Sequence, residues 1–275
     1  MRIYISADME GVTGLVDAAD VQPSGRDYER GRVMMTEDVN AAVRGALTSG
    51  ATDILVNDAH GPMRNLLSET LHPAARLMRG KPKTMGMLEG LDATYDAMLC
   101  VGFHSRAGVL GVMSHSFMGH EIEDIRLDER PVGEIGLAHA TAASLGVPVV
   151  MLTGDDTAVA EMAAWDPAVA GVAVKHAHDR FAAELRPVAE AREAIESAAA
   201  AAVAAHGTAA PHSRTATLAV RWQSASVASV LLGIPGVTSV DSRTVRATGT
   251  MPDLYRQFGV WMRVAASLTG QAPYC

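Results

Sequence analysis

Acidic side chains follow the first apolar segment of the chain. Residues 2–7 are rich in β-forming side chains, and Asp8 and Glu10 come directly after them. Residues i and i+2 of an extended chain share one face, so these two carboxylates are expected to point into the same space. Gly11 then allows the chain to turn away. Adjacent carboxylates repel each other, and a metal ion between them removes that repulsion. The alternative is that Asp8 caps the turn and Glu10 is solvated.

Two further apolar segments end in histidines. Residues 53–58 lead to His60, and residues 96–102 lead to His104. Continuous apolar runs of this length predict parallel strands that are covered on both faces. Either histidine alone would be interpreted as a hydrogen-bonded structural residue. Because ligands bind at the carboxyl ends of strands in open α/β sheets, we expect both histidines to meet the two carboxylates there.

Glu134 and His115 extend this group of candidates. Glu134 begins a predicted helix that runs to residue 145, where a carboxylate also interacts favourably with the helix dipole. His115 lies in a predicted short strand, 114–118, after the glycine-containing loop 105–113. That loop allows His115 to reach the site as a general acid or electrostatic stabiliser. The alternative is a structural strand residue.

The candidate ligands outnumber the needs of one catalytic zinc ion, which takes about three protein ligands and a water molecule. They suit two zinc ions per chain, roughly 3.5–4 Å apart, that share a carboxylate and activate water. Such a site hydrolyses amides or phosphate esters. Only two cysteines are present, so the ligands must be histidines and carboxylates. The candidate metal ligands are Asp8, Glu10, His60, His104 and Glu134.

Composition excludes several other classes of function. The net charge of −8 argues against a nucleic-acid surface. The sequence shows no apolar run of membrane-spanning length and no secretory signal, so the expected compartment is the cytoplasm. The H-E-x-x-H, G-x-S-x-G, P-loop and G-x-G-x-x-G patterns are missing, which removes support for zincins, serine hydrolases and nucleotide-binding folds.

Strands and helices alternate along the chain, which predicts an α/β fold with a mostly parallel sheet covered by helices. We expect a metal-binding catalytic α/β domain over 1–207 and a smaller C-terminal α/β domain over 208–275. Residues 121–132 are expected to form a hairpin, and residues 237–247 a strand. The smaller domain shows no chemically active group, so we expect it to pack against the first or to form a wall.

Five separated motifs together resemble the D-aminopeptidase family of zinc peptidases, the type encoded with dipeptide-transport genes. They are S-A-D-M-E-G at 6–11, N-D-A-H-G at 57–61, G-F-H at 102–104, S-H at 114–115 and G-E at 133–134. The resemblance implies a di-zinc aminopeptidase that releases N-terminal D-amino acids from short peptides by metal-activated water. It matches the candidate ligands to the family's metal ligands and His115 to its catalytic histidine. It also implies a homodecamer of two stacked five-membered rings around a channel.

Two other functions stay open on the residues alone. A metal-dependent phosphoesterase would need cationic groups near the metals, and Arg106 is the obvious nearby candidate. A non-catalytic metal- or solute-binding protein is the other alternative, although such a protein needs fewer ligands and an export signal.

Overall fold

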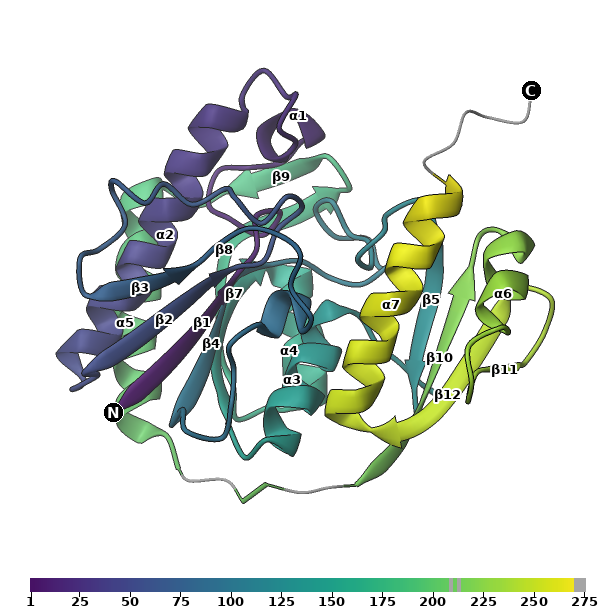
Figure 1. Cartoon of the computed structure of the whole chain (residues 1–275). Coiled ribbons are helices and arrows are strands. Elements are labelled where there is room, and N and C mark those ends of the chain that lie inside the picture. The colour runs from purple at the N-terminus through teal and green to yellow at the C-terminus, as the bar shows by residue number, and fades with distance from the viewer. Residues whose placement is uncertain (208–209, 212–213, 270–275) are drawn as a thin grey trace.

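The computed structural model describes residues 1–207, 210–211 and 214–269, and contains two sheets (Figure 1). The strands of the first sheet are β1 (Arg2–Ala7), β2 (Asp53–Asp58), β3 (Ala75–Met78), β4 (Ala97–Phe103), β7 (Val149–Asp155), β8 (Ala170–Asp179) and β9 (Ala182–Leu185). Their order is β3-β2-β1-β4-β7-β8-β9. Every pair from β3 to β8 is parallel, and β9 pairs antiparallel to β8. The predicted mostly parallel sheet is confirmed.

Helices cover both faces of this sheet (Figure 1). The helices on one face are α2 (Tyr28–Thr48) and α5 (Val188–Ala205), and α3 (Glu134–Ser144) and α4 (Asp156–Trp165) lie on the other. The short helix α1 (Ala18–Val21) precedes α2. Side chains of β1 alternate between the two cores: Ile3 and Ile5 pack in the core with α2 and α5, and Tyr4 packs in the other. The period of two along an extended strand explains this alternation.

The second sheet is antiparallel and joins two distant parts of the chain. Its strands are β5 (Ile122–Leu127), β6 (Arg130–Pro131), β10 (Thr215–Trp222), β11 (Thr238–Ser239) and β12 (Thr244–Thr250), in the order β11-β12-β10-β5-β6. The predicted hairpin is present as β5 and β6, and β5 pairs with β10. The division of the chain at 207/208 stays a prediction. Helices α6 (Ala225–Leu231) and α7 (Met251–Thr269) complete this part.

Two predicted strands are wrong. Residues 237–247 do not form one strand, because a turn separates β11 from β12. Residues 114–118 bend instead of extending, because Phe117 takes a positive φ angle. Met113, just before this segment, also takes a positive φ angle. No helix in the described ranges has the length and apolar character needed to cross a membrane.

The loop after β1 is fixed on both sides. On one side, the amide of Gly11 donates to the carbonyl of Gly102 at 2.8 Å, at the end of β4. On the other, Lys175 of β8 is fully buried, and its Nζ donates to the carbonyls of Glu10, Val12 and Leu15 at 2.6, 3.0 and 2.5 Å. The backbone that carries Asp8 and Glu10 is therefore held between β4 and β8.

Gly11 is required by this close approach. A Cβ atom at Gly11 would lie 1.9 Å from the carbonyl oxygen of Phe103, far inside van der Waals contact. We predict that Gly11→Ala lowers the free energy of unfolding by about 2–3 kcal/mol, because backbone atoms must shift to relieve the overlap. Urea unfolding of the metal-free protein measures this. Gly249→Ala is the control, since its Cβ would have no neighbour closer than 3.7 Å among the described residues. Equal stability of the two variants would contradict the prediction.

Candidate metal centre

The structure brings all the predicted site residues to one pocket of about 430 Å³ at the carboxyl ends of β1, β2 and β4. Glu134 reaches the same pocket from the first turn of α3, as the sequence predicted. The predicted residues that line this pocket are Asp8, Glu10, His60, His104, His115 and Glu134.

The two carboxylates after β1 are buried and only partly satisfied. Oδ1 of Asp8 accepts from the amide of Met9 at 2.9 Å, whereas Oδ2 accepts no hydrogen bond from the described residues. Oε1 of Glu10 lies 3.2 Å from Nε2 of His60, and its Oε2 is also without a partner there. Leaving a buried acceptor unsatisfied costs about 1–3 kcal/mol, and more for a charged group. A cation between these oxygens would remove that cost.

A hydrogen-bond network sets the tautomer of His60. Nδ2 of Asn65 donates to Oδ1 of Asp58 and to the carbonyl of His60, both at 2.7 Å, so Oδ1 of Asn65 faces the imidazole. Tyr28 also donates to this Oδ1, at 2.8 Å. Nδ1 of His60 lies 3.3 Å from the same oxygen and must donate to it. Nε2 is then the atom left to bind a metal, the usual arrangement of a metal-binding histidine and its outer hydrogen-bond partner.

His104 is oriented in the same way. Its Nδ1 lies 3.0 Å from the carbonyl of Ser105, which can only accept, so Nε2 is free to bind a metal. That Nε2 lies 3.6 Å from Oδ2 of Asp8 and 3.4 Å from Oε1 of Glu134, and it has no hydrogen-bond partner in the described chain. Oε1 of Glu134 also accepts from the amide of Phe117 at 2.6 Å.

His115 stacks on His104, with ring centroids 4.2 Å apart and planes 10° from parallel. Its Nδ1 lies 2.9 Å from the carbonyl of Met113, which leaves Nε2 facing the pocket. Ligand atoms of Asp8, His104 and Glu134 lie within 4.8 Å of one another, and so do those of Glu10, His104 and His115. His104 belongs to both groups, and its one free nitrogen can bind a single cation, so the two groups overlap at a place that could hold a metal ion.

Charge and burial together shift the pKa values of the groups in the site. Burial raises the pKa of Asp8 well above its usual value, and the charges of Glu10 and Glu134 add to the shift. Burial opposes the charged form of His60, but Glu10 outweighs it and raises the pKa to about 9. Burial likewise opposes the charge on His104, yet Glu134 and its neighbours raise its pKa well above normal. A bound cation must displace the protons on these groups.

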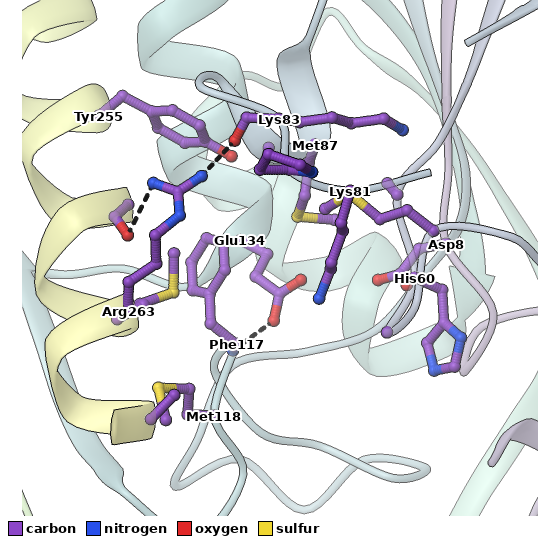
Figure 2. Close-up of a pocket in the computed structure, with 18 of the residues that line it drawn as sticks. Asp8, His60, Lys81, Lys83, Met87, Phe117, Met118, Glu134, Tyr255 and Arg263 are labelled. Carbon is purple, nitrogen blue, oxygen red and sulfur yellow. Dashed lines mark hydrogen bonds between the residues drawn. The ribbon is translucent and has the colours of Figure 1, made fainter. Parts of the chain in front are cut away.

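The opposite wall of the pocket was not anticipated from the sequence. Tyr255 and Arg263 of α7 line it, together with Lys81 and Lys83 from the loop after β3 (Figure 2). Arg106, the cation expected beside the metals, does not line the pocket. Its guanidinium donates to the carbonyl of Ala107 at 2.9 Å instead.

Comparisons with known proteins identify the fold and the family of the chain. A sequence model described as D-aminopeptidase matches residues 1–260. A D-aminopeptidase of Bacillus subtilis (strain 168) is 45% identical over 182 residues. The matched residues make up 66% of each chain, just under two thirds. The solved structure described as Zn-dependent D-aminopeptidase DppA from Bacillus subtilis, a self-compartmentalizing protease, matches 100% of both chains at 35% identity with a TM-score of 0.92.

These matches confirm the predicted α/β fold and the predicted aminopeptidase class, and they give no support to a phosphoesterase or a non-catalytic binding protein. With a family match over nearly the whole chain and a structural match over all of it, the protein belongs to the D-aminopeptidase family.

Proposed function

We propose that this protein is a zinc-dependent aminopeptidase that removes the N-terminal residue, by preference a D-amino acid, from short peptides. The observation that carries the proposal is the set of buried ligand atoms without partners in the described chain: Oδ2 of Asp8, Oε2 of Glu10 and Nε2 of His104. The names of the similar proteins support zinc and the D-amino acid preference. The cytoplasmic location stays a prediction.

The donor set fits zinc, which accepts imidazole nitrogens and carboxylate oxygens. We assign Asp8, Glu10, His60, His104 and Glu134 as the residues that hold two zinc ions. When bound, zinc polarises the substrate carbonyl and lowers the pKa of a water molecule, so that the water can attack near neutral pH.

His115 supplies what the ligand residues lack, a group that can exchange a proton with the substrate. Cleavage of a peptide bond produces an amine that needs a proton. Nδ1 of His115 donates to Met113, so Nε2 is the atom that carries the exchangeable proton. Burial and the neighbouring His104 hold the pKa of His115 below its usual value, which makes its imidazolium a stronger acid. We assign it as general acid or as electrostatic stabiliser of the developing oxyanion.

The proposed site predicts the zinc content of the protein. Elemental analysis of zinc-saturated protein should give two ions per chain. Asp8→Ala should lose more activity than replacement of any single histidine, because Asp8 is expected to touch both ions.

The fraction of sites that hold zinc should rise with pH towards about 9, where His60 loses the proton that competes with zinc. Glu190→Ala, which replaces an exposed carboxylate, is the control and should leave the zinc content and the activity unchanged. One ion or none per saturated chain would rule out the two-zinc site.

The second prediction separates catalysis from metal binding at His115. His115→Ala should lower kcat by about a hundredfold or more with both zinc ions retained, because the leaving amine loses its proton donor. Stopped assays on D-Ala-D-Ala and elemental analysis of the same sample measure this. His178→Ala, at an exposed histidine, should leave both unchanged. Retained activity would refute the catalytic role, and loss of zinc would make His115 a ligand.

The third prediction concerns assembly. The structurally similar protein is described as self-compartmentalizing. We propose that this chain forms a decamer of two stacked five-membered rings, whose channel admits short peptides. Light scattering should give about ten chain masses, and folded proteins should resist digestion. A fully active monomer would show that the ring is not required for function.

A further inference from the structure

The pocket is electrically polarised. Its lining holds the carboxylates of Asp8, Glu10 and Glu134, and three cations, Lys81, Lys83 and Arg263, come from the loop after β3 and from α7. A short peptide has the matching polarity, because its amino end is positive and its carboxyl end is negative. The three cations differ in whether other groups of the protein already bind them.

Two of the cations are occupied by the protein itself. Nζ of Lys83 donates to Oδ1 of Asn57 at 2.7 Å and to the carbonyl of Asp58 at 2.6 Å. Arg263 donates to the carbonyls of Lys83 at 2.7 Å and Gly259 at 3.3 Å. These bonds fix the loop that carries Lys81 between β2 and α7.

Lys81 has no such partner. Lys81 lines the pocket (Figure 2), and within the described chain no hydrogen bond or ion pair joins its Nζ to another residue. Lys81 is exposed to solvent where it lines the pocket, and partial desolvation and the neighbouring charge of Arg263 hold its pKa below its usual value. An anion beside Lys81 would supply the counter-charge that the protein does not provide.

The anion that fits best is the carboxylate at the end of a short peptide. Ligand pockets range over about 300–1,000 Å³, and this pocket of about 430 Å³ lies near the lower limit. A short peptide of the proposed kind carries one free carboxylate, which can lie beside Lys81 while the amino end lies towards the acidic residues.

We propose that Lys81 binds the C-terminal carboxylate of the peptide substrate, and that it makes the enzyme selective for short peptides with a free carboxyl end. The proposal rests on the proposed aminopeptidase function. It makes Lys81 a specificity-determining residue, because its contact lies away from the scissile bond.

The test compares the zinc-loaded wild type with Lys81→Met on D-Ala-D-Ala and on its C-terminal amide. The wild type should favour the free acid in kcat/KM by roughly ten- to a hundredfold, the range expected for a hydrogen bond between two charged groups. Lys81→Met should reduce this acid-to-amide ratio to about one, mainly through a higher KM for the acid. Lys81→Arg should restore most of the ratio, because it retains the charge.

Arg79→Met is the matched control, since it removes an exposed charge from the same loop without lining the pocket. Its acid-to-amide ratio should equal that of the wild type. A ratio in Lys81→Met equal to that of the wild type would overturn the proposal, while peptide hydrolysis by the wild type would still support the proposed function. Failure of the zinc-loaded wild type to hydrolyse either peptide would refute the function itself.

Discussion

Mutual repulsion among buried carboxylates is the constraint on which the rest of this structure depends. Asp8, Glu10 and Glu134 are nearly inaccessible to solvent and face one small space. Burial and the neighbouring carboxylates raise the pKa of Asp8, and the carboxylates raise the pKa values of His60 and His104, so protons on these groups offset part of the repulsion. A divalent cation bound between these carboxylates, as proposed above, would remove the repulsion directly.

The surrounding fold is arranged to withstand that repulsion. Lys175 holds three carbonyls of the loop that carries Glu10, and Asp58 holds Asn65, which in turn orients His60. None of these groups needs to touch the substrate. They fix the ligand atoms before a metal binds, so little conformational freedom is lost on binding. This explains why a buried lysine in β8 lies beside the loop after β1, although 165 residues separate Lys175 from Glu10 in sequence.

The sequence predicted one side of the pocket and missed the other, for a physical reason. His60 and His104 directly follow buried strands, and parallel strands place their carboxyl ends at one edge, so local pattern and topology together locate them. Lys81 and Arg263 reach the pocket through tertiary packing of a loop and of α7, which leaves no periodic or motif signal. Asn65 could have been suspected only from the need of His60 for a partner. The bend at 114–118 was missed because positive φ angles at residues such as Phe117 are not evident from residue type.

The second sheet positions one wall of the pocket. β5 leaves the first part of the chain, pairs with β10, and so brings the segment that ends in α7 against α3 and the metal site. α7 then supplies Tyr255 and Arg263 to the pocket wall, and Arg263 fixes the loop of Lys81. The distance between the metal ligands and this wall is therefore set by the docking of one sheet against the other. In the proposed function a peptide contacts both the acidic residues and this wall, so its recognition depends on how the two sheets pack.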